Sequence, residues 1–254
     1  MKTQTIKKIA LLLIITVVTF SCSSSSDIDT AVEETTGTLH NAFAVFDADE
    51  TDIYLQGTNV IIETTGNPNH TTPYWGSGHA KYTAPTATSE ADMTPSRIPG
   101  FDGSASLLVS QNPSLESTTS NTSLGAIGIA VSGAAIFNDQ EGNGALDEAA
   151  VTLDYTGAHI GPQEYHYHLE PRAWSDDDDH LIGVISDGFF IYGRKCNATG
   201  TYPTDLDASG GHTSTTQHTV TAEYHYHIIN EIYTTTASYI LFAGPYKGAP
   251  NAIN

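Results

Sequence analysis

The chain has 254 residues, with 29 acidic residues against 9 Lys and Arg, which gives a formal net charge of −20 at pH 7. This balance excludes nucleic acid as an expected partner, because phosphate contacts require clustered basic side chains. It suits a solvated exterior that attracts cations.

Residues 1–21 have the three parts of an export signal. Three lysines precede the apolar run 9–20, and Ser21 stands directly before Cys22. A membrane-spanning helix needs about 20 apolar residues, so we expect the signal to be cleaved rather than kept as an anchor. Cys22 at the cleavage point, followed by a serine run, resembles the start of a bacterial lipoprotein. Acyl chains on Cys22 would hold the protein on a membrane, and we expect an outer-membrane location that faces the periplasm or the cell surface.

Residues 22–37 are mostly Ser, Thr and acidic residues, with few apolar side chains to offset the entropy lost on ordering. We therefore predict a flexible tether. After removal of the signal the chain keeps 6 basic and 29 acidic residues, a formal charge of −23. If Cys22 is acylated, Cys196 is the only remaining thiol and no intramolecular disulfide can form. We interpret Cys196 as a residue without a functional partner.

Residues 38–254 read as one β-rich domain. Short apolar runs rich in Val, Ile, Phe and Tyr alternate with Gly, Asn, Pro and Thr, and no long run has a helical period. Only Ala145–Val151 indicates a short helix.

Three segments of this domain occur twice in the same order, at offsets of 55, 53 and 59 residues. They are IGIAVSGAAIFN at 127–138 and IGVISDGFFIYG at 182–193, LDYTGAH at 153–159 and LDASGGH at 206–212, and EYHYH at 164–168 and 223–227. We predict an internal duplication, with repeats at about 127–168 and 182–227. The expected fold is an all-β, internally duplicated β-sandwich or barrel-like domain with long loops and little helix. Asp187-Gly188 between two apolar runs predicts a two-residue hairpin turn.

Side chains alternate between the two faces of a strand, so each EYHYH segment has a tyrosine face and a Glu-His-His face. The tyrosine faces are expected to pack on the core. The opposite stripes, formed by Glu164, His166 and His168 and by Glu223, His225 and His227, are expected to face a cleft or solvent.

Two histidines at positions i and i+2 have Cα atoms about 6.6–7 Å apart, so both rings can reach one ion at about 2.0–2.1 Å. The preceding loop of each half offers a third imidazole, His159 or His212, after a glycine that permits a tight turn. Asp154 and Asp207 are expected to accept the other ring N–H. The candidate metal ligands are His159, His166, His168, His212, His225 and His227. Whether they form two sites or one shared site is left open.

Other interpretations of these residues remain open. The histidines can instead form a structural hydrogen-bond network with the tyrosines and aspartates. Asp187 is expected to serve its turn, with a role as a carboxylate ligand or base as the alternative. The acidic run Asp176–Asp179 offers oxygen ligands to calcium, although such runs are usually solvated loops. The stretch 139–144 resembles a calcium loop but has Ala150 at the twelfth position, where glutamate is needed.

From about Gly66 to Gly248 the chain resembles the bacterial YHYH-domain proteins. The resemblance rests on TGNPNH at 65–70, on both EYHYH segments, and on IGIAVSGAAIFN, IGVISDGFFIYG and LDASGGH. It implies a domain identity rather than a particular activity.

We expect an exported, lipid-anchored protein that binds a transition-metal ion through its histidine clusters. Imidazole ligands without thiolate favour Zn²⁺ or Cu²⁺. One alternative is a metal-dependent hydrolase or hydratase, in which three histidines leave a position for water and Glu164 or Glu223 acts as the base. Another is a non-enzymatic surface interaction module with structural histidines.

Overall fold

The computed structural model describes residues 37–85, 101–142, 144–148, 150–161, 164–233 and 237–254. The predicted signal at 1–21 and all but the last residue of the predicted tether at 22–37 lie outside these residues. Across the described ranges, no helix is both long and apolar enough to cross a membrane.

The described residues are organised in β-strands and short helical turns, which confirms the predicted all-β class. A three-stranded antiparallel sheet consists, in spatial order, of β1 (Thr51–Gln56), β2 (Asn59–Thr64) and β3 (Ala105–Ser110). Two small antiparallel pairs are β6 (Gln140–Glu141) with β7 (Gly144–Ala145) and β14 (Ile232–Tyr233) with β15 (Ser238–Tyr239). The helical turns are the 3-10 segments η1 (Asn41–Val45), η2 (Leu146–Glu148) and η3 (Ala150–Thr152).

The prediction of a single short helix over Ala145–Val151 is therefore wrong. The described residues of this range are divided between β7, η2 and η3. A segment of this length is too short to be stable as an isolated α-helix, so tertiary contacts decide its conformation.

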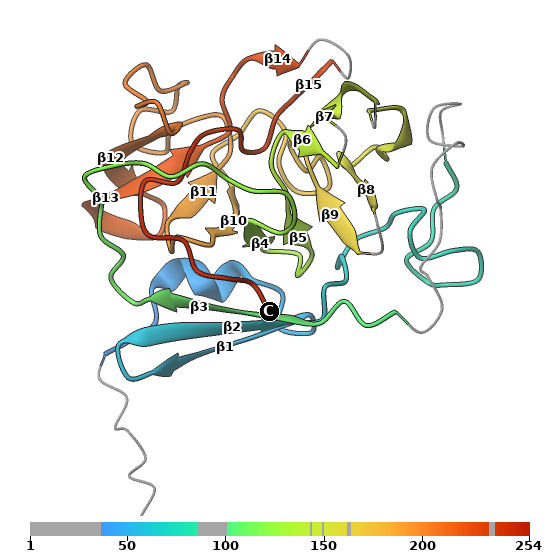
Figure 1. Ribbon diagram of the computed structural model, residues 1–254, viewed down its shortest axis with the longest axis horizontal. Coiled ribbons are helices and arrows are strands. Elements are labelled where there is room, and N and C mark those ends of the chain that lie inside the picture. Colours follow the sequence, from blue (N-terminus) through green and yellow to red (C-terminus); the bar gives the residue numbers. More distant parts are fainter. Residues whose placement is uncertain (1–36, 86–100, 143, 149, 162–163, 234–236) are drawn as a thin grey trace, which may run out of the picture. The chain divides into compact units, whose positions relative to one another are not determined.

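The main sheet has eight strands in the order β12-β13-β11-β10-β4-β5-β9-β8 (Figure 1). In chain order they are β4 (Gly128–Ala130), β5 (Ala135–Ile136), β8 (Ala158–Ile160), β9 (Tyr165–Tyr167), β10 (Leu181–Ile185), β11 (Phe190–Tyr192), β12 (Gly211–Thr216) and β13 (Thr219–His227). The order is linear, with β8 and β12 at its two ends.

The strand order follows the sequence repeat. Strands β4, β5, β9 and β8 form one end of the sheet, β10, β11, β13 and β12 form the other, and β4 pairs antiparallel with β10 between them. Matching positions also have matching partners: Ile136 pairs with Tyr167 as Ile191 pairs with Tyr226. A duplication with an approximate twofold axis would produce this order, although the duplication itself stays a prediction.

The hairpin between β10 and β11 turns through three residues rather than the two predicted. The N–H of Gly188 donates to the carbonyl of Ile185 at 2.8 Å, and the N–H of Ile185 donates to the carbonyl of Phe189 at 2.9 Å. Gly188 has a φ of +93°. A positive φ at the last loop residue is typical of a type I turn followed by a bulge, which glycine accepts without strain.

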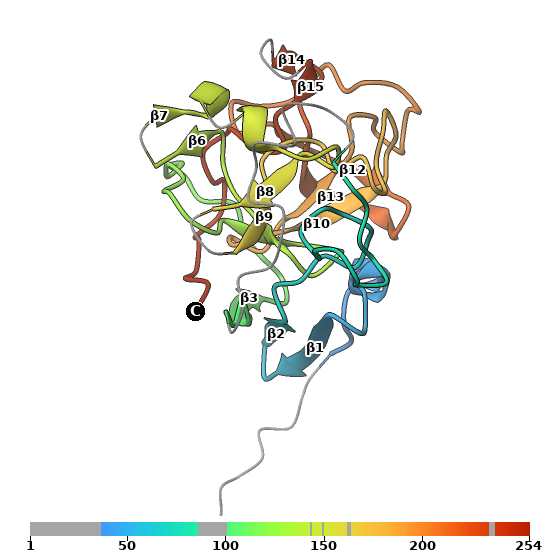
Figure 2. The ribbon, with the colours of Figure 1, turned by 90° about the vertical axis from the view of Figure 1, so that its right-hand side faces the viewer.

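Apolar side chains cover both faces of the main sheet. On β11, Phe190 and Tyr192 belong to a buried cluster that includes Val60 and Leu107 of the three-stranded sheet. Ile191 points the other way, into a cluster with Tyr165, Tyr167 and Tyr226 of the two EYHYH segments, 164–168 and 223–227, which we call the pentads. The three-stranded sheet thus packs on one face of the main sheet, which corresponds to the sandwich alternative of the prediction. Figure 2 views this arrangement from the β8–β9 end, with β6 and β7 beside it.

Candidate metal sites

In each half, a tight turn places the first histidine on a strand of the main sheet. The N–H of Asp154 donates to the carbonyl of Ala158 at 2.8 Å, and the N–H of Gly157 donates to the carbonyl of Asp154 at 3.0 Å. Gly157 has a φ of +79°, and a Cβ there would lie 2.8 Å from the Cβ of Leu169, so the turn requires glycine. The chain then enters β8, where His159 lies directly opposite His166 of β9.

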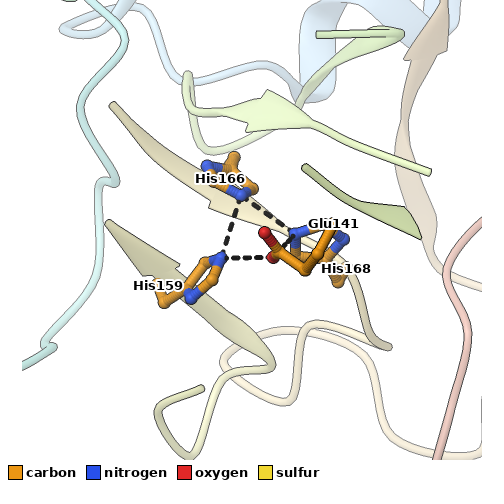
Figure 3. Close-up of side chains that lie close together, drawn as sticks. All are labelled: Glu141, His159, His166 and His168. Carbon is orange, nitrogen blue, oxygen red and sulfur yellow. Dashed lines mark hydrogen bonds and ion pairs between the residues drawn. The ribbon is translucent and has the colours of Figure 1, made fainter. Parts of the chain in front are cut away.

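Three imidazoles and one carboxylate converge at this end of the sheet (Figure 3). Nε2 of His166 lies 3.1 Å from Nε2 of His159 and 2.9 Å from Nε2 of His168. Oε1 of Glu141, from β6, lies 3.0 Å from Nε2 of both His159 and His168. Four donors at about 2.0–2.1 Å from a tetrahedral ion are about 3.3–3.4 Å apart, so shifts of a few tenths of an ångström would admit an ion.

The outer nitrogens of two of these rings are committed to main-chain acceptors. Nδ1–H of His166 donates to the carbonyl of Glu164 at 3.1 Å, and Nδ1–H of His168 donates to the carbonyl of Asn138 at 2.6 Å. A carbonyl oxygen only accepts, and a neutral imidazole has one N–H. Both Nε2 atoms therefore direct lone pairs at one another, an arrangement that is repulsive unless a proton or a metal ion lies between them.

The carboxylate of Glu141 gives the cluster a negative charge that suits a cation. Burial lowers the pKa of His166 well below its usual value, and the neighbouring rings of His168 and His159 lower it further. Contacts with His159 and His168 hold the pKa of Glu141 well below its usual range, so its carboxylate is ionised at neutral pH. A carboxylate oxygen beside imidazole nitrogens is a donor set that divalent transition metals bind.

The second half repeats this arrangement with His212, His225 and His227. Nε2 of His227 lies 3.1 Å from Nε2 of His225 and 3.2 Å from Nε2 of His212. Nδ1–H of His225 donates to the carbonyl of Glu223, and Nδ1–H of His227 donates to the carbonyl of Gly193. Burial lowers the pKa of His225 and that of His227 to about 4.

The two histidine clusters are separate. Strands β9 and β13 are five steps apart in the main sheet, which is roughly 24 Å at about 4.8 Å per step. They lie toward opposite ends of the sheet in Figure 1. The geometry thus offers two sites rather than one shared site.

The expectation that the histidine stripes face a cleft or solvent is wrong. His166 and His168 are each 1 % exposed, and His227 is 2 % exposed. Phe137 stacks on His166 with ring centroids 3.7 Å apart, and it accounts for part of this cover. The alternation of faces is correct, but the histidines are buried as the tyrosines Tyr165, Tyr167 and Tyr226 are.

The tyrosine face of each pentad has its own hydrogen bonds. The hydroxyl of Tyr165 donates to Asp154 at 2.6 Å, as the hydroxyl of Tyr224 donates to Asp207 at 3.1 Å. The second tyrosine contacts the hairpin turn in both halves. Tyr167 lies 2.9 Å from the hydroxyl of Ser132, and Tyr226 donates to the carboxylate of Asp187. In each pentad the histidines thus form the cluster while the tyrosines fix the loop and the hairpin.

The predicted ring partners Asp154 and Asp207 do not contact the histidines. Each instead accepts main-chain N–H groups of its own turn, which places the following histidine. Nδ1 of His159 lies 2.7 Å from Oγ1 of Thr152, and Nδ1 of His212 lies 2.8 Å from Oδ1 of Asp205. A carboxylate partner is therefore present in the second half, two residues before the predicted one.

The remaining predicted carboxylates also lie outside the clusters. Glu164 and Glu223 act on the rings through their carbonyls, not their carboxyl groups. The carboxylate of Glu223 lies 3.2 Å from Nε2 of His40, and Glu164 lines a separate cavity of about 740 Å³. The carboxylate of Asp187 accepts hydrogen bonds from Tyr226, from the N–H of Gly248 and, within its own turn, from the N–H of Phe189.

Glu141 and Cys196 were not predicted as site residues. Cys196 is 1 % exposed, and its Sγ belongs to a group with His212 and His227 whose ligand atoms all lie within 4.8 Å of one another. This corrects its interpretation as a residue without a partner. A signal was present in the sequence: the offset of 55 that aligns 127–138 with 182–193 also aligns Glu141 with Cys196.

The calcium alternatives fit these contacts poorly. In the acidic run, Asp177 pairs with Lys195 at 3.0 Å and with Arg194 at 3.3 Å, so its charge is matched by cationic side chains. Asp178 accepts N–H groups of the loop itself. Glu141, from the stretch 139–144, belongs to the histidine cluster.

The sequence comparison gives one match. Residues 106–204 match the sequence model of a family described as YHYH protein. This range contains the whole Glu141 cluster and Cys196, ends before His212, and is narrower than the resemblance from Gly66 to Gly248. No curated protein and no solved structure matches the chain. The chain thus contains a YHYH domain, and the matched part of that domain carries the first histidine cluster.

Proposed function

We propose that this protein is an exported, lipid-anchored protein that binds transition-metal ions, zinc or copper, through its two histidine clusters. The observation that carries the proposal is the convergence of lone pairs at His166 and His168, whose Nε2 atoms lie 2.9 Å apart while their Nδ1–H groups donate to carbonyls. An ion bound between these nitrogens converts a repulsive contact into coordination. The surrounding hydrogen bonds fix the ring orientation, as they do around protein-bound metals.

The donor set of the first cluster supports holding an ion rather than hydrolysis. Catalytic zinc sites usually have three protein ligands and a position open to water, whereas structural sites have four protein ligands. Here Glu141 joins His159, His166 and His168, and the three rings are at most 5 % exposed. The carboxyl groups of Glu164 and Glu223, the bases of the hydrolase alternative, contact neither cluster.

The test is elemental analysis of the protein purified without added metal, followed by zinc and copper titration after chelation. The double variant His166→Ala/His168→Ala should lose one bound ion per chain. His180→Ala is the matched control, because His180 is an exposed histidine bound to Asp178 outside both clusters, and its metal content should be unchanged. Saturation at 100 times the dissociation constant should stabilise the wild type against unfolding by about 2.7 kcal/mol for each occupied site, and a chelator should reverse this.

Two results would refute the proposal. One is a folded wild-type protein that binds neither zinc nor copper, which would favour the surface interaction module with structural histidines. The other is a metal content that does not change in the double variant.

A further inference from the structure

The two clusters contain corresponding histidines, but they differ in the donor residue that lies beside those histidines. Glu141 and Cys196 occupy aligned positions of the repeat, three residues after the carbonyls of Asn138 and Gly193. Those carbonyls accept the Nδ1–H of His168 and of His227, so in both halves the main chain before the differing residue makes the same hydrogen bond to a histidine ring. One cluster therefore has a carboxylate oxygen where the other has a thiol sulfur.

The thiol of Cys196 is placed to reach an ion. It is a free cysteine in the interior, and its Sγ lies 3.4 Å from Oγ of Ser214. That hydroxyl lies 3.2 Å from Nε2 of His212, so thiol, hydroxyl and imidazole line the same small space. Nε2 of His227 faces this space as well, 3.2 Å from Nε2 of His212.

The ring partners differ in the same sense. Nδ1 of His212 pairs with the carboxylate of Asp205, while the corresponding His159 pairs with the hydroxyl of Thr152. A carboxylate behind a ligand imidazole makes that imidazole a stronger donor. The second cluster therefore combines a polarisable sulfur with a more basic nitrogen.

On this basis, and resting on the metal binding proposed above, we propose that Cys196, His212 and His227 form a copper site, with His225 beside it, distinct from a zinc site formed by Glu141, His159, His166 and His168. Thiolate is a soft ligand that suits Cu(I) as well as zinc, and a cysteine with two histidines makes the trigonal set that is typical of Cu(II) sites. Carboxylate is a harder ligand and does not favour copper over zinc through softness. Binding at the second site breaks the S–H bond of Cys196, forms a copper–sulfur bond and releases the proton to solvent.

The first experiment compares the wild type with Cys196→Ser and Glu141→Gln, two variants of nearly unchanged shape. Anaerobic Cu(I) titration against a competing chelator should show one tight site, with affinity at least about tenfold weaker in Cys196→Ser and unchanged in Glu141→Gln. Zinc titration should show the loss of one site in Glu141→Gln. Urea unfolding in chelator checks that both variants are folded.

The second experiment tests the ligand atom directly. Cu(II) added to the wild type should give an intense sulfur-to-copper charge-transfer absorption, which Cys196→Ser should lack. Glu141→Cys supplies the converse, because a thiol in the first cluster should create a second copper site with its own charge-transfer absorption.

The outcomes separate this inference from the proposed function. A wild type that binds copper or zinc, with no thiolate absorption and with equal copper affinity in Cys196→Ser, would overturn the copper assignment but leave metal binding intact. Identical metal preferences at the two clusters would overturn it too. Absence of any metal binding would remove both proposals.

Discussion

Asp154 is expected to contribute more to stability than Asp207, although the two residues occupy corresponding turns. Asp154 is 5 % exposed, and its carboxylate accepts hydrogen bonds from the N–H of Thr156 at 2.8 Å and from the hydroxyls of Tyr165 and Thr72 at 2.6 Å each. Asp207 accepts from two N–H groups and the hydroxyl of Tyr224, but its side chain is 34 % exposed.

The magnitudes follow from what each replacement leaves behind. Asp154→Ala removes the acceptor of these three donors and also of the Thr156 hydroxyl and the Ala158 N–H. Each unsatisfied buried group costs about 1–3 kcal/mol. The hydroxyls of Thr156 and Tyr165 lie 2.8 Å apart and can bond to one another. We therefore expect a total loss of about 3–5 kcal/mol rather than the full sum. In Asp207→Ala, water can reach the freed donors, so the loss should be about 1 kcal/mol.

Urea unfolding of the wild type and both variants measures this difference, with a chelator present so that metal binding does not contribute. The free energy of unfolding in water and the slope with urea are fitted together, and equal slopes indicate that the unfolded states are comparable. Equal losses in the two variants, or a larger loss in Asp207→Ala, would refute the reasoning that burial of the carboxylate sets its contribution.

Two further predictions concern the turn and the anchor. Gly157→Ala should lose more than about 2 kcal/mol of stability and weaken metal binding at the Glu141 cluster, because its Cβ would lie 2.8 Å from the Cβ of Leu169 at a φ of +79°. Gly200→Ala is the control, because Gly200 has a φ of +69° and open space around the Cβ; this variant should lose about 1 kcal/mol of stability with metal affinity unchanged. Denaturation measures the stability of both variants, and metal titration measures their metal affinity. Equal effects in the two variants would argue against the steric explanation. Cys22→Ser should move the exported protein from the membrane fraction to the soluble fraction on cell fractionation, whereas retention in the membrane fraction would contradict lipid anchoring.

The sequence was most informative where spacing alone fixes geometry. Alternation along a strand places His166 and His168 on the face opposite Tyr165 and Tyr167, and the structure brings those two rings together with His159. The repeat also predicted that the second half would bring the corresponding histidines together, as it does. These relations depend on the local backbone, which short-range patterns determine.

The sequence was least informative where a contact depends on how distant segments pack. Asp154 was expected to hold the ring of His159, but the tight turn directs its carboxylate toward its own N–H groups and toward Tyr165. The histidine face is buried by side chains such as that of Phe137, whose position depends on the tertiary arrangement. Glu141 reaches its cluster from a separate two-stranded pair, so only the extended repeat alignment could have suggested it.

In the second EYHYH segment, the hydrogen bonds of a tyrosine help to orient a histidine on the opposite face. Tyr226 donates to Asp187 and accepts the N–H of Lys247, so one hydroxyl fixes the hairpin turn and the following segment against β13. With β13 held in this way, Nδ1–H of His227 meets the carbonyl of Gly193, which lies just beyond the strand that the same hairpin leads into. The ring is thereby oriented before any ion arrives. The entropy of ordering the ring is therefore lost on folding and not on binding. Hydrogen bonds on the tyrosine face that hold the ring in place thus raise the affinity of the cluster for an ion.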